Sequence, residues 1–118
     1  MNQETLKGLM NEHGIAPFAE ELASADRDIR VAAARRLTDR DAIRRVVLEN
    51  PDAFVRRELI AKIDDQQLLK TLANDVDGDV RACAVERITD KVFLQKKALW
   101  AEKEGFVLKA ISERIKKL

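Results

Sequence analysis

A short phrase that recurs along this chain constrains its fold more than any other feature. The phrase is an acidic residue, two further residues, Ile or Val followed by Arg, and apolar positions that end in a basic residue and Ile or Leu. It begins at Asp26, Asp52 and Asp77, and a weaker copy begins at Glu104. The copies are 26, 25 and 27 residues apart. A steady period of this length is typical of repeat proteins, in which each unit buries its apolar side against its neighbours.

The apolar positions of each copy are spaced as on one side of an α-helix. In the third copy, Val80, Ala84, Val85 and Ile88 fall at positions i, i+4, i+5 and i+8. We therefore expect the first and last apolar positions of the three clear copies to be buried, namely Ile29, Val55, Val80, Leu37, Ile63 and Ile88.

An aspartate stands three residues before the first apolar position of each clear copy. A carboxylate at this place can accept hydrogen bonds from the free N–H groups of the first helical turn. A second aspartate follows each copy, at Asp39, Asp65 and Asp90, and opens a shorter stretch with the same helical spacing. The pattern in each unit therefore predicts a longer helix, then a turn of two or three residues, then a shorter helix.

The pattern predicts about nine short helices in a single domain over residues 1–118. The expected ranges are 3–12, 17–24, 27–37, 40–49, 53–63, 66–74, 78–88, 91–101 and 104–117. Residues 26–115 carry the recognisable copies, whereas residues 1–25 match the pattern only loosely and are expected to form an N-terminal cap. The four glycines and two prolines are too few for an all-β fold with many tight turns.

The phrase Asp-x-x-Val-Arg-x-x-Ala followed by Ile or Leu, and then Asp-x-x-x-Leu, resembles the short bacterial HEAT-like repeats and the related leucine-rich repeat variant. The resemblance covers residues 26–115 and implies an all-α fold, a right-handed α-α superhelix of the HEAT-like solenoid type. It says little about function, since such repeats serve many unrelated proteins. Leucine-rich variant repeats can follow a cysteine cluster that resembles an iron–sulfur site, and the single cysteine, Cys83, excludes that cofactor here.

No set of residues predicts catalysis or metal binding. The one histidine, His13, lies at the end of the first predicted helix, far along an elongated array from Cys83. A metal site needs several converging ligands. The sequence also contains no Gly-rich phosphate loop, no Ser/His/Asp set and no complete calcium loop. We therefore expect a protein that is not an enzyme and that holds neither a cofactor nor a metal.

Arginine recurs once in each clear copy, at Arg30, Arg56 and Arg81, so a repeat array should place these side chains in a row. One interpretation is structural, with Asp–Arg pairs that link neighbouring units, and we favour it. The alternative is a row of guanidinium groups that binds an acidic peptide or a phosphate backbone.

The charges are balanced overall but unevenly distributed. Residues 27–62 hold ten basic and six acidic side chains, a net charge of +4. The net charge is −4 over residues 1–26, −4 over 63–90 and +5 over 91–118, so its sign alternates along the chain. This alternation gives no continuous basic stripe, which nucleic-acid binding would favour. A local basic patch around Arg44 and Arg45 remains, so nucleic-acid binding by residues 27–62 is the alternative function.

The only tryptophan, Trp100, departs from the pattern because its equivalents in the other units, Glu49 and Asp75, are polar. Lys97 also stands where the other units have an apolar residue. A rotation of this helix by one residue would turn Trp100 inward, and we expect it to be buried. Otherwise Trp100 is an exposed anchor for a partner, since tryptophan is enriched at binding hot spots.

These observations predict a non-enzymatic scaffold that binds a protein partner. The candidate binding residues are Arg30, Arg56, Arg81, Arg44, Arg45 and Trp100. A third possibility is a spacer that only separates other domains. No stretch of about 18 apolar residues is present, the N-terminus lacks the pattern of a signal peptide, and a single cysteine fits a reducing compartment, so we expect a cytoplasmic protein without membrane contact.

Overall fold

The computed structural model describes residues 16–118 and shows only helices in that range. Eight α-helices and one 3-10 helix are present there, against about nine predicted helices. The helix predicted over residues 3–12, and His13, lie outside the described residues. The prediction of an all-α chain is confirmed for the described part. The chain divides into two compact units, residues 1–59 and 60–118, and each is described by itself.

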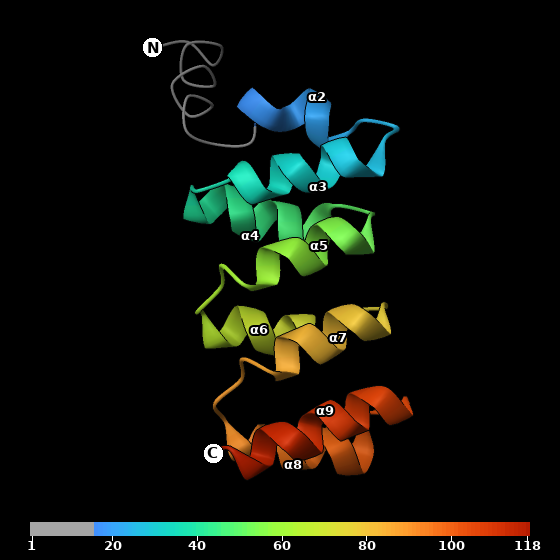
Figure 1. The fold of residues 1–118 in the computed structure, drawn as a ribbon. Coiled ribbons are helices and arrows are strands. Elements are labelled where there is room, and N and C mark those ends of the chain that lie inside the picture. The colour runs from blue at the N-terminus through green and yellow to red at the C-terminus, as the bar shows by residue number, and fades with distance from the viewer. Residues whose placement is uncertain (1–15) are drawn as a thin grey trace. The chain divides into compact units, whose positions relative to one another are not determined.

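The first unit contains the helices η1 (Ala16–Phe18), α2 (Ala19–Leu22), α3 (Arg27–Arg36) and α4 (Arg40–Glu49), followed by α5 (Ala53–Ile60), whose last residue belongs to the second unit (Figure 1). The range predicted as one helix over 17–24 is therefore divided between η1 and α2. The predicted starts of α3, α4 and α5 agree with the structure, because a capping aspartate marks each of them in the sequence.

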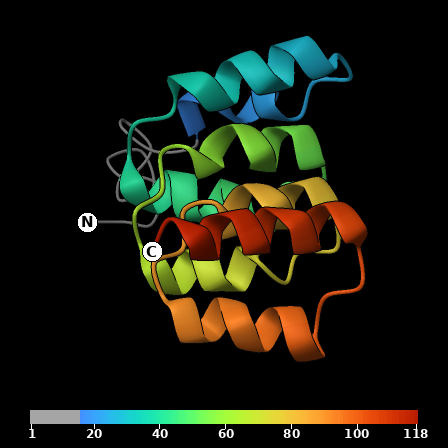
Figure 2. The same cartoon turned by 60° about the horizontal axis from the view of Figure 1, so that its bottom comes forward.

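The second unit contains α6 (Gln66–Leu72), α7 (Gly78–Val85), α8 (Lys91–Trp100) and α9 (Gly105–Lys116). Helix α7 packs against both α6 and α9, and α8 packs against α9. Within this unit α7 and α9 run in the same direction, opposite to α6 and α8 (Figures 1 and 2). The α6–α7 loop, the last turn of α8 and the first turn of α9 therefore lie at the same end of the unit.

The predicted aspartate caps are confirmed. Each of the six aspartates accepts a hydrogen bond from a backbone N–H in the first turn of its helix, at 2.8 to 3.0 Å. These residues are Asp26, Asp39, Asp52, Asp65, Asp77 and Asp90. Each cap satisfies a donor that would otherwise lack a partner within the helix, an interaction worth about 1 kcal/mol.

Five of the six predicted core positions are confirmed, with exposed fractions of 0 to 4%: Leu37, Val55, Ile63, Val80 and Ile88. The prediction for Ile29 is wrong, since this side chain is 46% exposed. Ile29 differs from its equivalents Val55 and Val80 in the length of the helix that precedes its own helix. Helix α2, ahead of α3, has 4 residues, whereas α4 has 10 and α6 has 7. A four-residue helix is too short to cover the start of α3.

Candidate interaction surfaces

The three repeated arginines make the same contact in every copy. Arg30, Arg56 and Arg81 each donate from Nη1 to the backbone carbonyl six residues earlier, at 2.7, 2.8 and 2.9 Å. The side chain of that acceptor residue in turn accepts from the backbone N–H two residues later, at 2.9 to 3.1 Å. The acceptor residues are Ser24, Asn50 and Asp75. Each arginine therefore fixes the turn that precedes its own helix.

Arg30 and Arg81 also pair with a carboxylate at, or just before, the start of the following copy. Arg30 donates to Asp52 Oδ2 from Nε and Nη2, at 2.9 and 2.6 Å. Arg81 donates to the two carboxylate oxygens of Glu102, at 2.9 and 3.3 Å. The side chains of Arg30 and Arg81 are only 19% and 15% exposed, and Arg56 is buried. These contacts support the structural interpretation of the arginine row.

The Asp52 carboxylate is the centre of the first of these pairs. Burial raises its pKa, but hydrogen bonds from Arg30 and from the Phe54 backbone N–H, with the charges of Arg30 and Arg27, outweigh burial and lower the pKa of Asp52. Arg27 contributes through a distance of 3.6 Å from its Nε to Asp52 Oδ2. Asp52 therefore both caps α5 and receives a guanidinium from α3.

The exposed arginines of the first unit lie among acidic side chains. Arg44 and Arg45 are both exposed on α4, and Arg45 Nε lies 3.2 Å from Glu49 Oε2. Two further ion pairs join α3 to its neighbours: Arg35 to Glu58 of α5 at 2.6 Å, and Arg36 to Glu21 of α2 at 3.1 Å. Such exposed pairs contribute little to stability. They do reduce the positive potential that the arginines would otherwise offer to a phosphate backbone.

A groove of about 860 Å³ opens in the same unit, between α2, the start of α3, the end of α4 and the start of α5. Leu22 and Val46 contribute apolar surface to its lining. Phe54, at its edge, is 45% exposed. The guanidinium carbons of Arg27 and Arg57 lie 4.1 and 5.2 Å from the centre of the Phe54 ring, within cation–π range.

The prediction that the second helix of each unit is the shorter one is wrong for α4 and α8, which have 10 residues each against 10 in α3 and 8 in α7. The outer side of α8, in the second unit, is more apolar than the equivalent positions that follow the capping aspartates Asp39 and Asp65. Val92, Leu99 and Trp100 are 56%, 74% and 82% exposed. Aligned on the capping aspartates, five of the six equivalent positions, which lie in α4, in α6 and in the turn after α6, are polar: Asp41, Leu48 and Glu49, and Gln67, Asn74 and Asp75. We refer to the six exposed positions of α8 as the α8 face: Lys91, Val92, Gln95, Lys96, Leu99 and Trp100.

The expectation that Trp100 is buried is wrong. Helix α8 keeps the register of α4 and α6, with Leu94 and Lys97 inside at 0% and 5% exposure. The one-residue rotation that would have brought Trp100 inward does not occur. The helix keeps this orientation because the side chain of Lys97 has polar partners in the interior.

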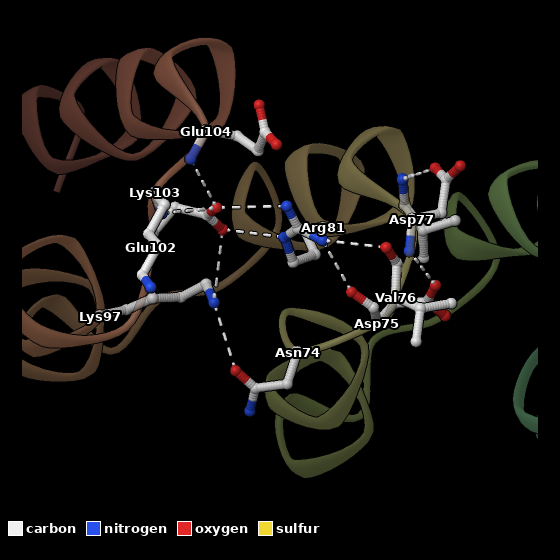
Figure 3. A network of polar contacts seen from close by, with 10 residues as sticks. Asn74, Asp75, Val76, Asp77, Arg81, Lys97, Glu102, Lys103 and Glu104 are labelled. Carbon is white, nitrogen blue, oxygen red and sulfur yellow. Dashed lines mark hydrogen bonds and ion pairs between the residues drawn. The ribbon is translucent and has the colours of Figure 1, made fainter.

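Lys97 ends in a polar network beneath the α8 face (Figure 3). Its Nζ donates to Asn74 Oδ1 at 3.2 Å and lies 3.6 Å from Glu102 Oε1. Burial lowers the pKa of Lys97, and attraction to Glu102 offsets this only in part. A cationic side chain thus occupies a position where α4 has Val46 and α6 has Leu72.

Glu102 holds this network together. Its side chain is 3% exposed and accepts from Arg81 and from the backbone N–H groups of Lys103 and Glu104, the latter two at 3.1 Å each. Burial raises the pKa of Glu102, but the Arg81 hydrogen bond, the Glu104 N–H and the charges of Arg81 and Lys97 lower it overall. One carboxylate therefore connects α7, α8 and the start of α9.

The unusual position of Lys97 is apparent from the sequence, whereas its partner Glu102 and the groove were not predicted. A signal for Glu102 exists, because it stands two residues before Glu104, as Asn50 stands before Asp52. Its side chain accepts from the N–H two residues later, as that of Asn50 does. A carboxylate at this position can in addition pair with Arg81.

Among residues 16–118, no group of three or more His, Cys, Asp and Glu side chains could hold a metal ion. No helix in the same range is both long enough and apolar enough to cross a membrane. Comparison of the chain with family models, with curated proteins and with solved structures gives no match. The function is therefore argued from the surfaces of the chain itself.

Proposed function

We propose that this chain is a non-enzymatic protein-interaction module built from HEAT-like repeats that stack as a right-handed α-α superhelix. The periodic phrase supports a common repeat unit, and so does the arginine contact made in the same way at Arg30, Arg56 and Arg81. Repeat arrays of this type present extended surfaces on which partners bind. A reducing compartment such as the cytoplasm is part of the proposal, since the chain has a single cysteine, Cys83.

The observation that carries the proposal is the exposure of Leu99 and Trp100 on the α8 face, at 74% and 82%. Single exposed apolar residues are ordinary, but a cluster of large ones marks an interaction site. Tryptophan is among the side chains that contribute most to binding at protein interfaces. The polar residues at the equivalent positions, Glu49 and Asp75 for Trp100, indicate that the fold does not need this apolar surface.

The buried network supports the same surface from beneath. Glu102 fixes the segment that follows Trp100, because it binds Arg81 and two backbone N–H groups at the start of α9. A surface held in place before binding loses less conformational entropy when a partner binds.

Affinity capture from the native cell, with quantification of the recovered proteins, tests this proposal. The wild-type chain is compared with the double variant Leu99→Ser/Trp100→Ser and with Val76→Ser. Val76 is 94% exposed but lies in the α6–α7 loop, so it is a matched control. We expect a partner that the wild type and Val76→Ser recover and the double variant loses. Equal recovery of every protein by all three chains would contradict the proposal.

The alternative function is nucleic-acid binding by residues 27–62. The observation in its favour is Phe54, a half-exposed ring between Arg27 and Arg57 that could stack on a base. The ion pairs of the same region weigh against it. A nucleic-acid site predicts that Arg44→Ala/Arg45→Ala weakens binding to a single-stranded oligonucleotide and lowers the salt dependence of that binding. The protein-interaction proposal predicts no such effect.

A further inference from the structure

We infer that the α8 face binds an acidic amphipathic helix of a partner protein. This inference rests on the proposed function and specifies the chemistry of the partner. It depends on three features of the structure: the spacing of the apolar side chains on α8, the charges around them, and the buried network that fixes the orientation of the helix.

The apolar side chains of the face are spaced to receive a helix. Val92 and Leu99 are seven residues apart, which places them on the same side of α8 about 10.5 Å apart along its axis. Trp100 lies beside Leu99 and widens the apolar surface at the end of the helix. A partner helix with apolar residues at positions i, i+3, i+4 and i+7 presents a stripe of matching length.

Within residues 91–103 the exposed charges are of one sign, and Lys96 lies between Val92 and Leu99 along the helix. Lys91, Lys96 and Lys103 are exposed, and the only acidic residue from 91 to 103 is Glu102, which is buried against Arg81. Acidic side chains beside the apolar stripe of a partner would meet these lysines, whereas basic ones would be repelled. A phosphate backbone would meet the lysines too, but it would leave Val92 and Leu99 without an apolar contact.

The orientation of α8 explains why this surface persists in the folded chain. A rotation that buried Leu99 would expose Leu94 and Lys97, which are 0% and 5% exposed and lie on the other side of the helix. Contacts with Asn74 and Glu102 hold the Lys97 ammonium inside. With α8 held in this orientation, Leu99 and Trp100 stay exposed to solvent, where a partner can contact them.

A displayed library of helical peptides, selected on the full chain, tests the inference. We expect enrichment of peptides with an apolar stripe flanked by Asp and Glu. Their binding should shift the emission of Trp100, the only tryptophan, to shorter wavelength as the indole leaves water. Leu99→Ser should weaken the selected peptides about 30-fold, as expected for a hot-spot residue. Val76→Ser should leave their affinity unchanged.

A charge reversal tests the acidic preference separately. The variant Lys91→Glu/Lys96→Glu should lose the acidic peptides and bind versions in which Lys replaces their Asp and Glu. Lys109→Glu, an exposed lysine on α9, is the matched control and should change little. Affinity for the acidic peptides should also fall as salt rises, because exposed charges are screened.

Several outcomes would overturn the inference. Selection of neutral or basic helices that still depend on Leu99 would reject the acidic partner and leave the proposed function standing. Concentration-dependent self-association that Leu99→Ser abolishes would make a second copy of the chain the occupant. A shift of Trp100 emission with phosphatidylserine vesicles, without any selected peptide, would make the face a lipid contact. Selected peptides that bind Leu99→Ser as well as the wild type would place the partner on another surface.

Discussion

Helices α4 and α8 follow the same kind of cap in their units, but they distribute polar and apolar side chains differently. In α4 the buried residues are Ala42, Ile43, Val46 and Val47, and the exposed side carries arginines. In α8 a lysine is inside, and Val92, Leu99 and Trp100 are outside. A shared helical pattern therefore fixes the place of a helix while leaving its outer surface free to change. The departure from the pattern, not the pattern, marks the candidate site.

The carboxylate that pairs with the repeated arginine also differs between the two units. In the first unit Arg30 pairs with Asp52, which is itself the cap of α5. In the second unit Arg81 pairs with Glu102, two residues before Glu104, and Glu104 makes no side-chain cap hydrogen bond. The shift of two residues brings the carboxylate within reach of Lys97. The inward lysine of α8 and the altered pair thus belong to one arrangement.

The largest effect should come from removing the shared carboxylate. Glu102→Gln keeps the shape of the side chain but leaves Arg81 and Lys97 without their buried counter-charge. We expect the free energy of unfolding to fall by about 3–5 kcal/mol, measured by denaturant unfolding. Glu104→Gln, exposed two residues later, should change it by less than about 0.5 kcal/mol. A similar small loss in both variants would show that the network does not hold α8 and α9.

A lysine placed in α4, at the position equivalent to Lys97 of α8, should also destabilise the chain. Val46→Lys places in α4 the residue that α8 has at the equivalent position, but α4 lacks the Asn74 and Glu102 partners. We expect a loss of about 3 kcal/mol in the free energy of unfolding, because the charge is buried without a partner. Val46→Met, measured in the same way, provides the control for the change of shape. Equal stability of the two variants would mean that α4 accepts an inward charge as readily as α8 does.

The reverse exchange should have a smaller effect, of opposite sign. Lys97→Leu gives α8 the apolar residue found at this position in α6, while Glu102 keeps Arg81 and its backbone donors. We expect the free energy of unfolding to rise by about 1 kcal/mol, since replacing a buried charge by an apolar side chain is often neutral or stabilising. A loss of more than about 2 kcal/mol would show that the lysine itself stabilises the fold.

The pH dependence of that difference follows from the lowered pKa of Lys97. The unfolded chain keeps this lysine protonated up to about pH 10.4, whereas the folded chain releases the proton at lower pH. Between these two values the unfolded state binds more protons, so the stability of the wild type rises with pH relative to Lys97→Leu. When the unfolding of the wild type and of Lys97→Leu is measured between pH 7 and 10.5, the difference between their free energies of unfolding should become smaller as the pH rises. A constant gap would contradict the lowered pKa.

Most of the fold could be predicted from the sequence because its determinants are local. A capping aspartate and an apolar position three residues later lie within one helical turn, and this pairing correctly predicts the buried Val55 and Val80. The same signal fails for Ile29, whose exposure depends on the length of the helix before it. Burial of a position with the right spacing still needs a neighbour long enough to cover it.

The candidate site was less predictable because its determinants are distant in the chain. The orientation of Trp100 depends on Lys97, whose partner Asn74 lies 23 residues earlier. No local pattern indicates that an inward lysine will find such a partner, so turning α8 to hide Trp100 was the simpler expectation. The arginine contacts were predictable in part: Asp–Arg pairs between copies were expected and Arg30 pairs with Asp52, but Arg81 pairs with Glu102 and not with an aspartate.

Helix α8 keeps Lys97 inside and Trp100 outside. Quenching of Trp100 fluorescence by acrylamide tests it most directly, because no other tryptophan contributes to the emission. With Trp100 82% exposed, we expect the folded chain to be quenched nearly as strongly as the chain unfolded in denaturant. Strong protection in the folded chain, relieved only on unfolding, would show that α8 is rotated with Trp100 inside and would contradict the account.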